Sequence, residues 1–357
     1  MRKLSFSSRT GSVIALTAIA WLLMISTSHL CLNQEKRPSN LVRMGYMPVV
    51  SNLASPLIDH VTRTDSLYFE ALKFSSFSEM AEAFRSGHIQ AAFIIAPLAI
   101  RLFEQGVPLK IVYIGNRHES TLVMRTGVKC EAPWDITGKT IAVPSRYSGH
   151  FLALKRYLRE HCLDRSGVNI VEIPPPEMPV ALGSSEIDGY FVGEPFASKA
   201  LAEGTAKRFL DVESVWPHFI CNLLIVREEL IREHPEWVRQ LVAIAARSGI
   251  WVREHVDEAA QIVSRYWGQD PGLIVYAFSH PPARFRFDLY VPIAEELSEM
   301  LQEMRREGLT NADIDAGAMV EDRFARAVQQ DFADPPEDLL SIKPDPSTGS
   351  RVKVALP

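Results

Sequence analysis

Apolar and polar residues follow two alternating periods along the chain, and this pattern predicts strands followed by helices. Residues 41–47 form an apolar run typical of a buried strand, and residues 51–64 predict a loop that turns into a helix. The same order recurs in strands at 67–74, 91–95 and 109–114 and in helices at 78–86 and from Pro97 onward. Strands that alternate with helices predict a mainly parallel sheet covered on both faces.

A second series of the same kind begins at residue 140. It predicts strands at 140–143, 168–173 and 189–192 and helices at 148–160 and 177–182. A β-prone run at 120–125 separates the two series, and another at 219–226 follows the second. We expect these two runs to cross between two doubly wound α/β lobes, which makes the first lobe discontinuous in sequence.

The end of the chain is predicted to be helical. Pro235 marks a helix start, and Trp237, Leu241 and Ile244 recur on one face. After residue 331 the chain is rich in Pro and Asp without an apolar period, so we expect disorder there. The expected divisions are a leader (1–30), a linker (31–40), the first lobe (41–120), the second lobe with hinge strands (121–220), the return with C-terminal helices (221–330), and the tail (331–357).

The amino terminus has the layout of an export signal. Arg2 and Lys3 precede a mostly apolar run at residues 13–25. A helix of that length spans about 20 Å, less than the roughly 30 Å of a bilayer core. We therefore expect cleavage and a periplasmic or extracytoplasmic protein, with a retained membrane anchor as the alternative. Lipidation at Cys31 is not favoured, because Leu30 stands where a small residue is needed.

Composition narrows the class of partner. An apolar content of 47% is ample for two lobes. A net charge of −5 gives no basic field for nucleic acid or anionic lipid, so we expect a small-molecule partner. We also expect a monomer whose membrane contact is limited to the leader. The four cysteines lack metal-ligand spacing. No metal, cofactor or disulfide is predicted.

The loops that follow the carboxyl ends of parallel strands are the expected site. The loop at 145–150 is the most suggestive, because Arg146 can bind an oxyanion through two hydrogen bonds and Ser148 can cap a helix. The alternative is that Arg146 points into solvent. Tyr147 and His150 belong to the same loop.

Two glutamates in other loops leave the sign of the ligand's charge open. Glu194 precedes Pro195 at a helix start, and Glu177 follows a run of three prolines. Both can be first-turn carboxylates that the helix dipole favours. If they face the cleft, they favour a ligand with an amine or ring nitrogen, or a bridging cation.

Motifs for catalysis are absent from the sequence. It contains no Gly-x-Ser-x-Gly elbow, no phosphate-binding loop that ends in Lys and Ser or Thr, and no His-Glu-x-x-His helix. Four histidines, at 150, 161, 218 and 234, are scattered without ligand spacing. We therefore expect no catalytic residue and no enzyme activity.

Several segments, taken in order, resemble the nitrate, sulfonate, taurine and bicarbonate-binding proteins of ABC importers. They lie at 41–48, 91–97, 138–144, 147–150, 174–178, 187–190 and 194–196, within a resemblance that covers about residues 41–249. The triple-proline turn followed by Glu177 and Met178 resembles the nitrate and bicarbonate branch. The resemblance implies a type II periplasmic-binding-protein fold without catalysis, and an ABC permease and its ATPase as partners.

The same resemblance implies a set of ligand-contacting positions. It places Phe77 where the nitrate branch has a tryptophan, and His118 where that branch has a glutamine. Both departures disfavour nitrate and favour a larger organic ligand such as a sulfonate or a heterocyclic vitamin precursor. The expected cleft walls are Asn52, Phe77, Pro97 and His118 on one lobe, and Arg146 to His150, Glu177 and Glu194 on the other.

Two other functions remain open from the sequence. A membrane-tethered sensing module would retain the apolar segment at 13–25 as its anchor. An enzyme related to thiamine-pyrimidine synthases shares the scaffold, but the cysteine-rich motif of that branch is missing here.

Overall fold

The computed structural model describes residues 8–32, 40–163, 167–279, 285–331 and 337–343. It divides into two compact units, Met1–Leu41 and Val42–Pro357, of which the first contains helix α1 (Ser8–Leu32). Apolar side chains of α1 such as Leu16 and Trp21 are more than half exposed. Among the described residues, no helix combines the length and apolarity that crossing a bilayer requires. The leader stays a prediction, and residues 33–39 of the expected linker lie outside the described residues.

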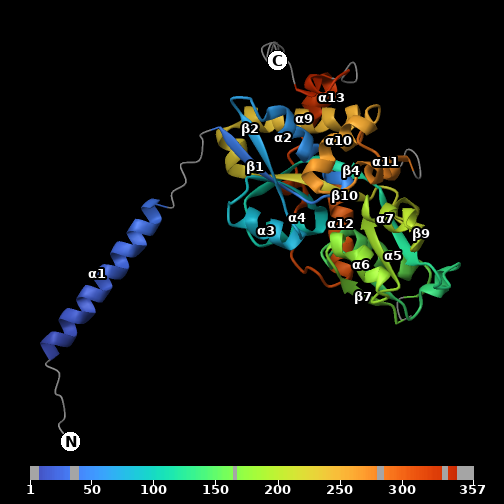
Figure 1. Ribbon diagram of the computed structural model, residues 1–357, viewed down its shortest axis with the longest axis horizontal. Helices are drawn as coiled ribbons and strands as arrows, with labels where there is room; N and C mark the ends of the chain where they lie inside the picture. The colour runs from blue at the N-terminus through green and yellow to red at the C-terminus, as the bar shows by residue number, and fades with distance from the viewer. Residues whose placement is uncertain (1–7, 33–39, 164–166, 280–284, 332–336, 344–357) are drawn as a thin grey trace, which may run out of the picture. The chain divides into compact units, whose positions relative to one another are not determined.

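The first sheet of the larger unit has five strands in the order β2-β1-β3-β10-β4 (Figure 1). Strands β1 and β3 are parallel, whereas β10 lies antiparallel between β3 and β4. The bounds are β1 Leu41–Tyr46, β2 Tyr68–Lys73, β3 Ala91–Ile95, β4 Leu109–Arg117 and β10 Ile220–Arg227.

The second sheet repeats this arrangement in the order β7-β6-β8-β5-β9. Strand β6 is parallel to β7 and β8, and β5 lies antiparallel between β8 and β9. The bounds are β5 Ser120–Arg125, β6 Thr140–Val143, β7 Asn169–Glu172, β8 Gly189–Gly193 and β9 Ala206–Asp211. The α/β fold with two lobes is confirmed; the residue limits of the lobes stay a prediction.

The two runs expected to cross between the lobes each belong to one sheet. The chain crosses at residues 118–119, between β4 and β5, and again along residues 212–219, between β9 and β10. Each strand that follows a crossing enters its new sheet antiparallel to its neighbours. Each sheet therefore combines parallel strands with one antiparallel strand, β10 in the first sheet and β5 in the second.

Helices cover both faces of the first sheet. Helices α2, α9, α10 and α13 pack with one another on one side, and α3 and α4 contact β3. The bounds are α2 Ala54–Thr62, α3 Phe77–Arg85, α4 Ala96–Glu104, α5 Gly149–Glu160, α6 Met178–Gly183, α7 Phe196–Ala202, α8 Glu228–Glu233, α9 Pro235–Val252, α10 Val256–Trp267, α11 Pro271–Ser279, α12 Ala294–Arg306 and α13 Arg323–Asp331. Short 3-10 helices are η1 Val50–Asn52, η2 Pro133–Ile136, η3 Pro175–Glu177, η4 Val212–Ser214, η5 Ala316–Met319 and η6 Leu340–Ile342.

The hydrophobic core continues from one lobe into the other. One buried cluster contains Ile94 of β3 together with Leu122 of β5 and Ile141 of β6. Successive side chains of a strand point to opposite faces, so the neighbouring Phe93 joins a second cluster with Leu241 of α9. The interior of the first lobe is thus in contact with the interior of the second.

Part of the predicted tail is structured. Ile342 of η6 is fully buried in the second cluster, and Arg247 of α9 donates to the Ser341 carbonyl at 3.0 Å. The expectation of disorder therefore does not describe residues 337–343. Residues 332–336 and 344–357 lie outside the described residues, and the expectation stays a prediction there.

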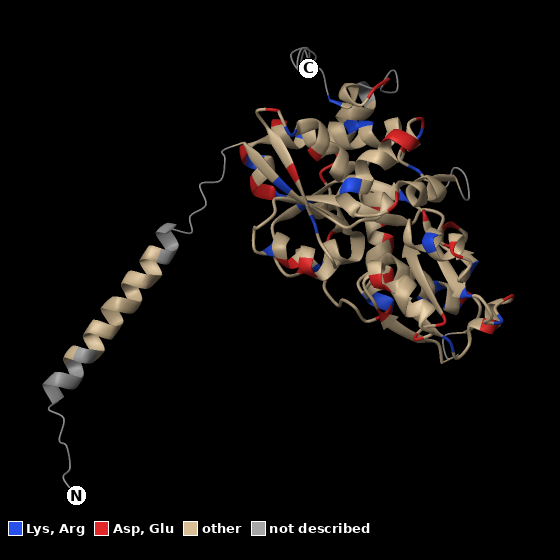
Figure 2. Ribbon diagram, viewed as in Figure 1, with Lys and Arg blue, Asp and Glu red and all other residues tan. Residues whose placement is uncertain are grey.

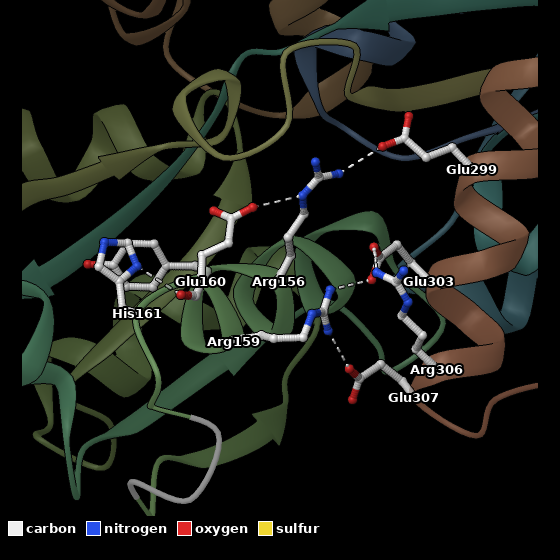
Figure 3. Close-up of polar contacts among 9 residues, drawn as sticks. Arg156, Arg159, Glu160, His161, Glu299, Glu303, Arg306 and Glu307 are labelled. Atoms are coloured by element: carbon white, nitrogen blue, oxygen red, sulfur yellow. Dashed lines mark hydrogen bonds and ion pairs between the residues drawn. The ribbon is translucent and has the colours of Figure 1, made fainter.

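Helix α12 contacts both α4 on the first sheet and α5 on the second. An ion-pair network joins α12 to α5 (Figure 3), with Arg159 Nη2 2.6 Å from Glu303 Oε2 and Arg159 Nη1 3.2 Å from Glu307 Oε1. Glu303 is only 5% exposed and also accepts from Arg306. Helix α12 thus links the lobes through charges that are partly shielded from water. Elsewhere, acidic and basic residues are interspersed over both lobes (Figure 2).

We predict that Arg159→Ala destabilises the protein. The substitution leaves the buried Glu303 carboxylate with one basic partner instead of two, so the free energy of unfolding should fall by about 1.5–3 kcal/mol, the range for a hydrogen bond to a charged group. Urea denaturation measures the change.

Arg85→Ala is the matched control. Arg85 pairs only with Glu82, and both side chains are more than half exposed, so its denaturation midpoint should not change. Equal midpoints for both variants would contradict a stabilising role for the link between α12 and α5.

Candidate functional site

A pocket of about 600 Å³ opens where loops of both lobes meet the C-terminal helices. Pro48 follows β1, Phe74 and Ser75 follow β2, Pro176 follows β7, and Phe196 follows β8. These are loops at the carboxyl ends of strands, where open α/β sheets bind ligands. The remaining lining residues are Lys73, Glu79, Lys199, Trp267, Gly268, Gln269, Asp270 and Leu273.

A buried group of polar residues lies where the two lobes join, close in sequence to this pocket. We call it the junction cluster; its members are Ser51, Glu119, Ser120, His150, Glu194, Cys221 and Asn222, each at most 3% exposed. Ser51 is three residues after the pocket residue Pro48, and Glu194 is two residues before the pocket residue Phe196. Two members of the junction cluster therefore lie on segments that line the pocket.

Hydrogen bonds within the cluster connect the two lobes. The Val50 amide of η1 donates to the Glu194 carbonyl at 2.8 Å, and the Glu194 amide donates to Glu119 Oε2 at 3.1 Å. Cys221 Sγ donates to Glu119 Oε1 at 3.0 Å. Because Glu119 lies on the first crossing and Cys221 follows the second, one carboxyl group contacts both crossings and the second lobe.

The backbone at the first crossing is strained. His118 and Glu119 have φ angles of 66° and 63°, a left-handed conformation that residues other than glycine seldom adopt and that is concentrated at functional sites. His118 Nε2 lies 2.6 Å from the Pro217 carbonyl of the second crossing. The two connections are therefore held against each other.

Burial controls the protonation of the cluster. Removal from water, together with the neighbouring Glu194, raises the pKa of Glu119 to about 8, although the hydrogen bond from Cys221 opposes the shift. Burial lowers the pKa of His150 to about 3, so this imidazole is neutral; its Nε2 lies 2.9 Å from Ser120 Oγ. At pH 7 the Glu119 carboxyl is mostly protonated, and neither His150 nor Cys221, whose pKa burial also raises, carries a charge.

Buried polar atoms without a hydrogen-bond partner concentrate around the cluster and the pocket. Within the described part of the chain they include Asn52 Nδ2, His150 Nδ1, Ser198 Oγ and Asn222 Oδ1 at the junction, and Trp267 Nε1 and Gln269 Oε1 at the pocket. Buried polar groups are nearly always hydrogen-bonded, because an unsatisfied one costs about 1–3 kcal/mol. A polar ligand would supply these missing bonds.

Gly193 makes room for the central carboxyl group. A Cβ atom at this position would lie 2.6 Å from Glu119 Oε1, well inside a van der Waals contact. The Gly-Glu-Pro sequence at 193–195 thus places a small residue where Glu119 enters the second lobe.

The structure buries six of the ten residues predicted from the sequence. Ser148 caps α5 by accepting from the Phe151 amide at 3.1 Å, and Asn52 Oδ1 accepts from the Met47 amide at 2.9 Å. Phe77 and Pro97 lie buried at the starts of α3 and α4. His150 and Glu194 belong to the junction cluster.

The other four predicted residues are more accessible. Arg146 and Glu177 are exposed, whereas His118 and Tyr147 are half-buried. The Arg101 guanidinium of α4 lies 5.9 Å from the Tyr147 ring centroid, a contact between the lobes. None of the ten lines the 600 Å³ pocket, and their contact with a ligand stays a prediction.

Sequence reasoning missed Ser51, Glu119, Cys221 and Asn222. A signal for two of them exists, because Cys221 and Asn222 interrupt an otherwise apolar strand between Phe219 and Val226. Glu119 gives no such signal, since a charged residue before a strand is usually part of an exposed turn.

Comparison with known proteins supports this architecture. The chain is 26% identical over 252 residues to the taurine-binding periplasmic protein of Escherichia coli (strain K12), an alignment that covers 66% of this chain and 77% of that protein. Its fold matches the crystal structure of the periplasmic nitrate-binding protein NrtA from Synechocystis PCC 6803 with a TM-score of 0.72, at 16% identity, over 82% of this chain and 89% of the other. The desulfurization enzyme DSZB also shares the fold, with a TM-score of 0.57, at 14% identity, over 82% and 99% of the two chains.

A family model also matches the chain. The model of the NMT1-like family matches residues 35–266, which include both sheets and the junction cluster. That range is well over half of the chain. This chain is therefore a member of the NMT1-like family.

Proposed function

We propose that this protein is the extracytoplasmic solute-binding component of an ABC importer and that it holds a small polar solute between its two lobes. The observation that carries the proposal is the set of unpartnered buried polar atoms at the junction of the lobes, on or near segments that also contribute residues to an open pocket. Taurine-binding and nitrate-binding proteins among the relatives support the same role.

The proposal includes the partners and the location. An ABC permease and its ATPase receive the solute, and the protein acts as a monomer in the periplasm or an equivalent extracytoplasmic space. The leader at 1–30 directs export, and periplasmic relatives support that location.

We infer further that the protein has no catalytic activity, although DSZB shares the fold. A serine and a histidine are in contact here, since Ser120 Oγ lies 2.9 Å from His150 Nε2. Both residues are buried, and no acceptor within the described residues orients His150 through Nδ1, as the third member of a catalytic triad would. This pair fits ligand recognition better than nucleophilic catalysis.

The first prediction of this proposal is stabilisation by one class of solute. A panel of inorganic oxyanions, sulfonates, amino acids and vitamin precursors is tested by thermal denaturation. A true ligand at a hundred times its Kd stabilises the folded state by about 2.7 kcal/mol and raises the melting temperature. A melting temperature unchanged by every compound would count against solute binding.

The second prediction concerns closure of the lobes. The Val50 amide donates to the Glu194 carbonyl across the junction, so solute binding that holds the lobes together should slow hydrogen exchange at Val50. The amide of Phe93, in the middle of β3 and buried, is the internal control and should exchange equally slowly with and without solute. Binding without added protection at Val50 would contradict closure at this hydrogen bond.

A further inference from the structure

Two acidic residues lie buried at the junction of the lobes. Glu119 and Glu194 are both almost completely buried, and they adjoin each other because Glu119 Oε2 accepts from the Glu194 amide. Ser51 and Cys221 are the other groups that influence the Glu119 carboxyl. No basic side chain is among these groups. A buried carboxylate is costly without a positive partner, so Glu119 at the junction is suited to a partner that arrives with the solute.

Further acceptor atoms lie beside the two carboxyl groups. Asn222 is 2% exposed; its Nδ2 donates to Ser51 Oγ at 2.6 Å, while its Oδ1 has no partner among the described residues. Ser198 is fully buried, its amide donates to Glu194 Oε2 at 2.8 Å, and its hydroxyl is likewise unpartnered there. The junction thus offers acceptor oxygens from three elements, β10, α7 and the first crossing.

Two basic residues line the pocket, whereas the buried Arg117 just before the first crossing is paired with Glu296 at 2.7 Å. Lys73 and Lys199 line the pocket; Lys73 Nζ donates to the Trp267 carbonyl at 3.4 Å, and Lys199 pairs with Glu203 at 3.0 Å. Arg146, the cation that the sequence suggested for an oxyanion, is exposed. The pocket therefore offers basic side chains, beside Glu79 and Asp270, and the junction offers buried carboxyl groups.

We infer that the solute carries a protonated amino group, which binds to Glu119 and Glu194 at the junction of the lobes. This inference rests on the proposed solute-binding function and narrows it to amines, including zwitterions whose anionic end lies toward Lys73 and Lys199. An ammonium group donates three hydrogen bonds, and the two carboxyl groups with Asn222 Oδ1 supply acceptors for them.

The inference has a thermodynamic signature. An ammonium group beside Glu119 favours the ionised carboxylate and lowers its raised pKa, so binding at pH 6.5 releases a proton. At pH 9 the carboxyl is already ionised, and binding releases none. The titratable groups that face Glu119 are Glu194, Cys221 and, through Ser120, His150; the thiol and the imidazole stay neutral over this range, because burial raises the pKa of the one and lowers that of the other.

Isothermal titration of the purified full chain with matched solutes tests the inference. Taurine is compared with isethionate, and β-alanine with 3-hydroxypropionate, so that each pair differs by an amine in place of a hydroxyl. The titrations are made at pH 6.5 with EDTA, which removes metal ions. Any other amine that stabilises the protein is compared with its own hydroxyl counterpart. We expect the amine of at least one pair to bind at least tenfold more tightly. Each titration is repeated in two buffers of different ionisation enthalpy, and the difference between the two measured binding enthalpies gives the number of protons released.

Substitutions locate the effect. Glu119→Gln should weaken amine binding about 10-fold or more, the loss expected for one charged hydrogen bond, and should abolish proton release. Glu186→Gln, which neutralises an exposed carboxylate of the second lobe, should change neither quantity. Proton release by the unsubstituted protein is measured independently, so the test does not depend on whether Glu119→Gln folds.

The outcomes separate this inference from the proposed function. If the hydroxyl compounds or nitrate bind as tightly as the amines, or if amine binding releases no proton at pH 6.5, the amine assignment is overturned while solute binding stands. A loss of binding in Arg146→Ala with none in Glu119→Gln would also overturn it. If no compound binds, both proposals fail.

Discussion

A buried carboxyl group at the crossing between the lobes is the constraint on which the site depends. Glu119 lies on the first crossing. It accepts from the thiol of Cys221 just after the second crossing and from the Glu194 amide of the second lobe. Both connections and one lobe therefore converge on one side chain that water does not reach. Its two oxygens fix the geometry of the junction, and the left-handed backbone at His118 and Glu119 is what turns this side chain inward.

The topology explains why such a junction exists in this fold. Each sheet has the same strand order, with an inserted antiparallel strand that enters from the other lobe. The crossings thus lie beside the carboxyl ends of the parallel strands, where the loops of both lobes already meet. A solute that completes the hydrogen bonds of the buried polar groups there would remove the free-energy cost of leaving them unsatisfied.

Much of the fold could be predicted from the sequence, because strand and helix periods are local. Strands β5 and β6 begin and end at the predicted residues, and α5 differs by one residue at its start. Strand β9 was missed, since Lys207 and Arg208 interrupt its apolar pattern. The site was harder. The loops were predicted, but Arg146 stood out by its charge and is exposed, whereas Glu119 has its role only through a positive φ angle and contacts with residues distant in sequence.

The proposed site depends on unpartnered polar atoms at the junction, Asn222 Oδ1 in the cluster and Ser198 Oγ near it. The most direct measurement is a crystal structure of the protein with the compound that stabilises it most. We expect solute atoms within hydrogen-bonding distance of Asn222 Oδ1 and Ser198 Oγ. A solute bound elsewhere, with both atoms still unpartnered, would contradict it.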